Sequence, residues 1–218
     1  MSRVFMNMFA FVFVAVAASM QAPAQPQAPA QPQNTSKCSL TAAQAPAIRS
    51  IKLGMSTAEI TSIFPGSSQR PEIKTALESS EGYPNYGVAR LYFQLSTYPT
   101  VAKDRFAGID GISVTLFDGR VAELWVNYAG RGSSPRGPLW PNVDEFIAKL
   151  SEAYALPAAR DWRQVAQNYK VLECSGLNIE AMIPNGSGSV SLRATKSFDT
   201  SRERAAEDEE KIRREFKP

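Results

Sequence analysis

Apolar residues recur at helical spacing in the stretch IKLGMSTAEITSIFPG, residues 51–66. Ile60, Ile63 and Phe64 share one face of the helix that this spacing predicts. Ser56 caps the N-terminus of that helix, and Glu59, three residues later, completes a capping box, while a Pro-Gly pair ends it. Because each conspicuous residue has a structural role, we interpret the stretch as a helix signal rather than a binding site.

A second capped helix is expected after the loop at 131–141, which is rich in Gly, Pro and Ser. Asn142 is its cap and Glu145 completes the box, and an apolar stripe at helical spacing then runs to Tyr154. The two expected helices therefore share one plan, with a cap, an acid three residues later and a large apolar residue after it.

From Gly87 onward the apolar period changes to two, which predicts strands. The stretch VARLYFQL, residues 88–95, alternates between apolar and polar positions. Residues 111–130 predict a hairpin, because Asp118-Gly119 separates two alternating runs and is a typical tight turn. Later strands are expected at 169–174, 177–183 and 189–195.

The order of helix and then strands thus occurs twice along the chain. It predicts an α+β fold in which two helix-then-antiparallel-strand units share one sheet, with the helices on one face. The expected organisation is a signal peptide at 1–21, a Pro/Gln/Ala-rich linker at 22–36, a first unit at 37–130, a second unit of the same domain at 131–198, and a charged helical tail at 199–218. We interpret the tail as a solvated helix that docks loosely or not at all, with a partner-binding helix as the alternative.

The first residues indicate export from the cytoplasm. Arg3 precedes an apolar run at 4–18, which is followed by small residues suited to a cleavage site. This run is shorter than the ~20 apolar residues that cross a bilayer. We therefore expect a secreted or periplasmic protein, and the alternative is a membrane anchor formed by an uncleaved N-terminal segment.

The chain has only two cysteines, Cys38 and Cys174. In an exported protein a disulfide between them is expected, and it would join the start of the folded region to a late strand. A pair of free thiols is the alternative.

Composition excludes several classes of function. The chain contains no His, so it has no Ser-His-Asp triad, no HExxH zinc site and no imidazole acid or base. Its 24 Lys and Arg residues are balanced by 21 Asp and Glu residues, and no one-signed basic patch stands out, so a nucleic-acid partner is not expected. Asp104, Asp110 and Asp118 lack the alternation of a calcium loop, and we expect neither a metal nor a cofactor.

The remaining candidates for chemistry are carboxylates and aromatic residues. Glu123 and Glu180 fall on expected strands, where a solvent-facing acid is the usual explanation, so we assign no catalytic residues. Aromatic residues in loops and on polar strand faces are candidates for contact with a partner, because they provide large contact area at low entropic cost. These candidates are Tyr83, Tyr86, Trp125 and Trp140. The two loop tyrosines and Trp140 could instead cover the core, and Trp125, like Tyr92, either packs under a helix or lines an exposed sheet.

The residues Leu53, Gly54, Met55, Ser56 and Glu59, followed by the hairpin around Asp118-Gly119, carry a resemblance to a known family. This pattern resembles the SmpA/OmlA (BamE-like) outer-membrane lipoprotein domain and, more broadly, the β-lactamase-inhibitor-protein-like fold. The resemblance covers residues 48–128 and implies two helices followed by a three-stranded antiparallel sheet. The inhibitor proteins contain two such units in tandem.

The chain departs from this family in two ways. It lacks the lipidated Cys that family members place directly after the signal peptide, and a long insertion separates the first helix from the strands. The resemblance implies a non-catalytic protein of the cell envelope or secreted space that acts by binding another protein. The alternatives are a protein inhibitor or small-ligand binder that uses the sheet face and, third, a carboxylate-based enzyme.

Overall fold

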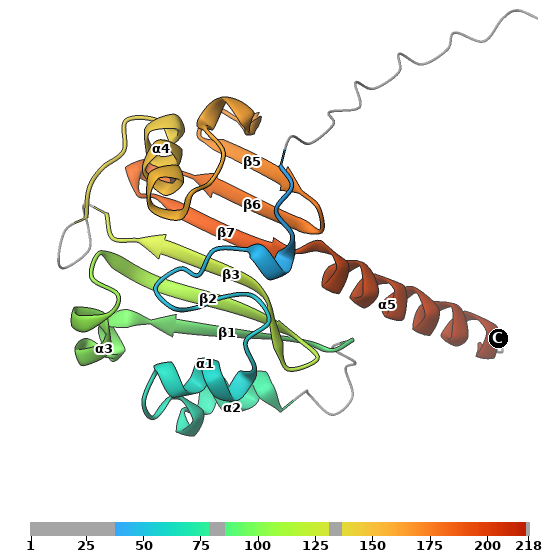
Figure 1. The fold of residues 1–218 in the computed structure, drawn as a ribbon. Coiled ribbons are helices and arrows are strands. Elements are labelled where there is room, and N and C mark those ends of the chain that lie inside the picture. Colours follow the sequence, from blue (N-terminus) through green and yellow to red (C-terminus); the bar gives the residue numbers. More distant parts are fainter. Residues whose placement is uncertain (1–37, 79–85, 131–136, 217–218) are drawn as a thin grey trace, which may run out of the picture. The chain divides into compact units, whose positions relative to one another are not determined.

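The computed structural model describes residues 38–78, 86–130 and 137–216, all of which belong to one compact unit (Figure 1). The expected signal peptide and linker, and Tyr83, lie outside the described residues. Among the described residues, no helix is long and apolar enough to cross a membrane.

A seven-stranded antiparallel sheet organises the fold, with the order β1-β2-β3-β7-β6-β5-β4. The strands are β1 (Val88–Gln94), β2 (Ile109–Phe117), β3 (Arg120–Tyr128), β4 (Arg163–Ala166), β5 (Tyr169–Cys174), β6 (Leu177–Met182) and β7 (Ser189–Ala194). The expected hairpin is β2 and β3, and Asp118 and Gly119 at its turn both have positive φ, as a tight two-residue turn requires. The last strands of the two expected units, β3 and β7, pair at the middle of the sheet.

The α-helices are α1 (Thr57–Ile63), α2 (Pro71–Leu77), α3 (Pro99–Asp104), α4 (Val143–Tyr154) and α5 (Thr195–Glu215). Short 3₁₀ helices lie at Ala42–Gln44, Ser67–Gln69, Leu95–Thr97, Ala159–Asp161 and Pro184–Gly186. The chain is therefore α+β with a charged C-terminal helix, as the sequence predicts. The helices α2 and α3, each of which begins with a Pro, and the short edge strand β4 are additions that the sequence pattern did not indicate.

The expected caps are present at α1 and α4. Ser56 accepts a hydrogen bond from the Glu59 amide, and the Glu59 carboxylate accepts one from the Ser56 amide at 2.7 Å. These bonds from Ser56 hold the pKa of Glu59 below its usual value, so the carboxylate supports the cap above the unfolded-state pKa and loses this effect as pH falls through the folded-state value. At α4 the Asn142 side chain accepts from the Glu145 amide at 2.9 Å, but the Glu145 carboxylate accepts from the Asn142 side chain at 3.0 Å rather than from its backbone, so the cap is confirmed and the expected box is not.

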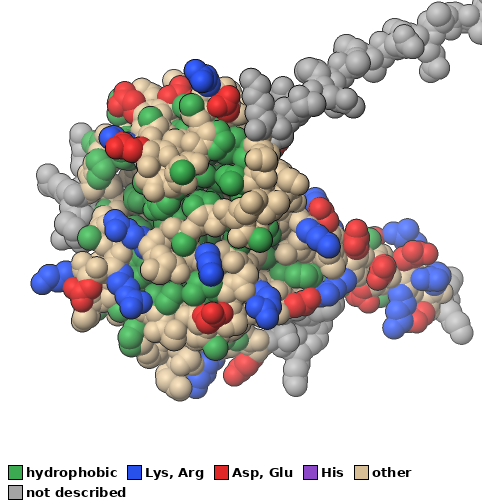
Figure 2. All heavy atoms as spheres, in the orientation of Figure 1, with side chains coloured by type: hydrophobic (Ala, Val, Ile, Leu, Met, Phe, Trp, Pro, Cys, Tyr) green, Lys and Arg blue, Asp and Glu red, His purple; other side chains and the backbone are tan. Residues whose placement is uncertain are grey.

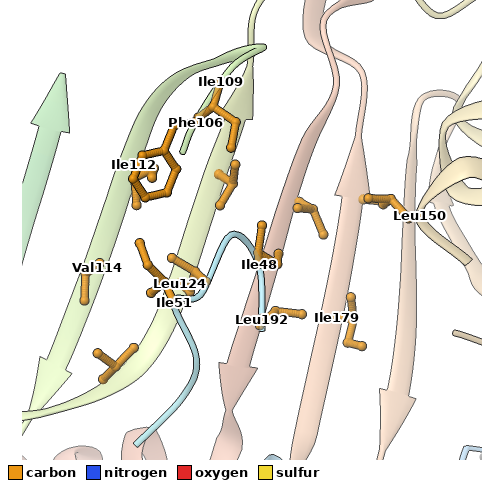
Figure 3. Packing of buried hydrophobic residues seen from close by; sticks show 14 of the residues in the cluster. Ile48, Ile51, Phe106, Ile109, Ile112, Val114, Leu124, Leu150, Ile179 and Leu192 are labelled. Carbon is orange, nitrogen blue, oxygen red and sulfur yellow. The ribbon is translucent and has the colours of Figure 1, made fainter. Parts of the chain in front are cut away.

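The core fills one face of the sheet. Phe64 of α1 stacks on Phe93 of β1 with ring centroids 4.0 Å apart. Before α1, residues 38–55 cross the same face, and a turn at 49–50 points Ile48 and Ile51 at Leu124 and Leu192 of the central strands (Figure 3). The helix α4 covers the second half of this face with a buried stripe that includes Phe146 and Leu150.

Cys38 and Cys174 form the expected disulfide, which spans 136 residues of sequence. Cys38 is buried at the start of the segment that crosses the apolar face, and Cys174 is the last residue of β5. The bridge therefore ties residues 38–55, which lack long secondary structure of their own, to the sheet that they cover.

The charged tail forms α5, and its first half contacts the rest of the unit. Arg204 makes two hydrogen bonds of 2.9 Å to the carboxylate of Asp118 at the β2–β3 turn. The Tyr86 hydroxyl donates to Asp208 at 3.1 Å. Beyond Asp208 every described residue of α5 is exposed, and charged side chains of both signs cover the helix (Figure 2). The helix α5 is therefore held against the unit as far as Asp208, and only its last third, residues 209–215, extends beyond that contact.

Reduction of the disulfide is expected to lower the free energy of unfolding by about 2–5 kcal/mol, because it releases a long loop in the unfolded chain. Urea unfolding with and without reductant measures this loss. The variant Cys38→Ser/Cys174→Ser serves as the control, since it should match the reduced protein and show no response to reductant. An unchanged midpoint after complete reduction would contradict a stabilising role of the bridge.

Candidate functional site

The strand residues that alternate with the core residues form a second, polar face of the sheet, which we call the open face. The strand register places Arg90, Thr115, Glu123 and Arg193 in one row across β1, β2, β3 and β7. A neighbouring row contains Tyr92, Ser113, Trp125 and Ser191.

The helices α1 to α4 leave the open face uncovered, because their buried side chains belong to the apolar cluster on the opposite side. The helix α5 reaches only the end of the face, where the Phe198 ring lies 5.3 Å from the Arg193 guanidinium. Tyr92 is 49% exposed on the edge strand β1, and Trp125 is partly exposed on β3. The alternation in sequence therefore produces a surface of polar and aromatic side chains.

Arg193 lies at the centre of an ionic network on this face. Its Nε and Nη2 atoms donate to Oε1 of Glu123 at 2.8 and 2.6 Å. Its Nη1 atom lies 3.5 Å from Oε1 of Glu180 on β6. The side chains of Glu123 and Glu180 are only 12% and 11% exposed, so one guanidinium compensates two nearly buried carboxylates.

Neutral donors extend this network to five strands. The Thr115 hydroxyl donates to Oε2 of Glu123, and the Tyr169 hydroxyl donates to Oε2 of Glu180, each at 2.9 Å. Burial and the bond to Glu180 raise the pKa of Tyr169. Partial burial opposes the charged form of Arg193, but its bonds and proximity to the two carboxylates outweigh that effect and raise its pKa. Tyr169 therefore stays neutral and Arg193 stays charged near neutral pH.

Two hollows lie next to each other on the open face. The first, which we call the central hollow, has a volume of about 400 Å³ and is lined by Arg90, Ser113, Thr115, Glu123, Trp125, Asn127 and Arg193. The second, which we call the edge hollow, has a volume of about 310 Å³ and lies at the β1 edge beside α2, and its lining residues are Arg70, Glu72, Ile73, Arg90, Tyr92, Gln94, Thr97 and Tyr98, with Glu72 paired to Arg70. Arg90 lines both hollows. Together they give the face a recessed region beside β1.

Gly111 of β2 lies beneath the ring of Tyr92, which lines the edge hollow. A Cβ atom at this position would lie 2.6 Å from the Tyr92 hydroxyl and 3.1 Å from its ring, so the ring covers the glycine. The same hydroxyl donates to Oε1 of Gln94 at 2.7 Å, which fixes the orientation of the ring. Tyr92 is thus held flat against the neighbouring strand although half of it is exposed.

The structure places the sequence-predicted aromatic candidates in different environments. Trp125 lies on the open face and lines the central hollow. Trp140 instead packs against the core, with its ring 5.3 Å from that of Phe146, and its buried Nε1 atom has no hydrogen-bond partner among the described residues. Tyr86 is partly buried and bonded to α5. These three residues do not form one cluster, and Tyr83 lies outside the described residues.

The fold-signature residues of the first helix line a groove elsewhere on the unit. Leu53, Gly54, Met55 and Glu59 contribute to a hollow of about 760 Å³ that also includes residues of the β2–β3 turn and the start of α5. Both carboxylates in its lining are already engaged, Glu59 by Ser56 and Asp118 by Arg204. Ser56 makes the cap itself and does not line this groove.

The described residues contain no group of three or more His, Cys, Asp or Glu side chains that could hold a metal ion. Glu123 and Glu180 are engaged by Arg193 and by hydroxyl donors, so neither carboxylate is presented as a base to the central hollow. The arrangement is suited to recognition by hydrogen bonds, charge and aromatic contact.

Sequence reasoning missed the importance of Arg90 and Arg193, whereas Tyr92 was noted with Trp125 as a residue that could line an exposed sheet. A signal was present, since Arg90, Thr115 and Glu123 all occupy the polar positions of alternating strands. The pairing of Glu123 with Arg193 depends on β3 lying next to β7, however, and that adjacency joins segments 70 residues apart.

Replacement of Arg193 by Met is expected to lower the free energy of unfolding by about 3 kcal/mol at neutral pH, because it leaves two nearly buried carboxylates without a cation. Urea unfolding at pH 7 measures this loss. As a control, Glu123→Gln/Arg193→Met should recover part of the loss, and an Arg193→Met variant as stable as the parent at pH 7 would contradict the role of the network.

Comparison with known proteins adds no relative to this description: no protein-family model, no curated protein and no solved structure matches the chain.

Proposed function

We propose that this protein is an exported, non-catalytic binding module of the cell envelope or secreted space, and that it binds another protein through the open face. The observation that carries the proposal is the open face itself, which presents Tyr92 and Trp125 beside two hollows and is not covered by α1 to α4. Exposed aromatic residues around a recessed region are typical of the centres of protein interfaces.

The rigidity of the face supports the proposal. The network around Arg193 joins β2, β3, β7, β6 and β5 by side-chain bonds, so the polar groups hold one arrangement before a partner arrives. A preorganised surface loses less conformational entropy on binding than a mobile one. This arrangement therefore favours recognition by a folded surface that undergoes little rearrangement.

The compartment is proposed on two grounds. The N-terminal residues have the layout of a signal peptide, and the disulfide between Cys38 and Cys174 is compatible with an oxidising space. The first half, with α1 and α2 followed by β1, β2 and β3 and with α3 inserted after β1, has the order that the BamE-like resemblance implies, whereas the second half has one helix, α4, and four strands. The order of the first half supports a role in which contact with another protein, rather than catalysis, is the function.

A second candidate function uses the same surface. The central hollow, at about 400 Å³, is within the size range of small-molecule sites, so an inhibitor or small-ligand binder is the alternative. A carboxylate-based enzyme is the third candidate, and it requires that substitution of Glu123 or Glu180 by the matching amide abolish turnover of some substrate.

A photo-crosslinking amino acid at position 92 tests the proposed function in the cells that produce the protein. Position 165 on the opposite edge strand β4 is a matched control, because Val165 is 46% exposed and Tyr92 is 49% exposed. We expect an adduct of defined mass with another protein from position 92 and none from position 165.

The partner identified in this way is then titrated against purified variants. Tyr92→Ala and Trp125→Ala should each weaken binding by roughly tenfold, as removal of an interface anchor does, while Val165→Ala leaves the affinity unchanged. Identical adducts from both positions, or a partner affinity that is insensitive to Tyr92 and Trp125, would refute binding through the open face.

A further inference from the structure

Two residues that line the central hollow, Glu123 and Asn127, already use their side-chain oxygens as hydrogen-bond acceptors within the fold. Oε1 of Glu123 accepts from Arg193, and its Oε2 atom accepts from Thr115. Oδ1 of Asn127 accepts from the Trp125 indole at 2.9 Å and from the Ser189 hydroxyl at 2.8 Å. Because an indole N–H only donates, this contact also fixes which end of the Asn127 amide carries the oxygen.

Three hydrogen-bond donors of the same hollow have no acceptor within the described fold. Within the described part of the chain, no carboxylate lies at ion-pair distance from Arg90, and neither the Ser113 hydroxyl nor the Asn127 Nδ2 atom has a hydrogen-bond partner. Arg193, the other cation in the lining, is shared by Glu123 and Glu180. The hollow therefore offers a guanidinium, a hydroxyl and an amide N–H group to a ligand and offers it no free carboxylate.

This pattern selects an anionic acceptor. A carboxylate accepts two parallel bonds from a guanidinium and has further lone pairs for a hydroxyl and an amide donor. A neutral side-chain amide of the same shape has an NH₂ group in place of one carboxylate oxygen, so it cannot accept the second guanidinium bond and lacks the negative charge that Arg90 attracts. The site thus distinguishes an acid from its amide by hydrogen bonding as well as by charge.

The surroundings of Arg90 indicate the source of the carboxylate. Arg90 lies between the central hollow, which Trp125 lines, and the edge hollow, which Tyr92 and Tyr98 line. A chain segment that crosses the face can place an acidic side chain on Arg90 and an apolar side chain against the aromatic residues on either side. A free small acid would occupy one hollow and leave the other unfilled.

We infer that Arg90 is the electrostatic anchor of the open face and that the central hollow receives the carboxylate of an acidic side chain in a partner protein, between apolar neighbours that contact Trp125 and Tyr92. This inference rests on the proposed function, because it specifies the chemistry of the partner at the same surface. Since Arg90 is exposed, the interaction weakens as ionic strength rises.

The test uses two peptide probes that differ only at the acid. Acetyl-Phe-Glu-Phe-amide and acetyl-Phe-Gln-Phe-amide are titrated against the purified, ¹⁵N-labelled full chain. The Trp125 indole N–H and Asn127 amide signals report binding in ¹H–¹⁵N NMR spectra. We expect the Glu peptide to bind at least tenfold more tightly at low salt and to lose this advantage in Arg90→Gln. The matched control is Arg105→Gln, which removes an exposed charge at the end of α3 and should preserve the advantage.

Three outcomes would overturn the inference: equal affinity for the two peptides, an acid preference that survives Arg90→Gln, or no binding of either peptide at millimolar concentration. A third probe, 3-phenylpropanoate, distinguishes the source of the carboxylate, since tight binding of this free acid without binding of the Glu peptide assigns the hollow to a small ligand instead. If crosslinking from position 92 identifies a partner while the two peptides bind alike, the proposed function stands and only the role of Arg90 is wrong.

Discussion

The ion pairs of Arg193 with Glu123 and Glu180 determine how the polar side of this sheet is built. Arg193 lies on β7 and Glu123 on β3, so their contact crosses the line where the two helix-then-strand units meet. Two nearly buried carboxylates on one sheet face would repel each other without this cation. Because the hydroxyls of Thr115 and Tyr169 occupy the outer carboxylate oxygens, the network is closed by its own members.

The two faces of the sheet therefore have different roles, one in packing and the other in polar contacts. The apolar face is buried in the folded protein, since α1, α4 and residues 38–55 pack their side chains against it. The disulfide holds residues 38–55 in place. The opposite face contributes polar bonds and retains unused capacity at Arg90 and the aromatic residues beside it. Binding at such a face requires no rearrangement of the core.

Local signals in the sequence were sufficient for much of this architecture. Period-two alternation placed Tyr92 and Trp125 opposite the buried aliphatic residues, and the caps and the hairpin turn lie where their short motifs predict. Non-local pairings were not accessible in the same way. The partners of Glu123 became evident only once β7 was known to lie beside β3. Asp118 of the hairpin turn is paired with Arg204 because α5 docks against the turn.

The central claim concerns two arginines on the open face. Arg193 is engaged by ion pairs within the fold, and Arg90 is available to bind a partner. ¹⁵N NMR of the guanidinium groups in the free protein tests it most directly. For Arg193 the account predicts a slowly exchanging Hε and resolved Nη signals that report hindered rotation, and for Arg90 a rapidly exchanging Hε and averaged Nη signals. Averaged signals from Arg193, or hindered signals from Arg90, would contradict it.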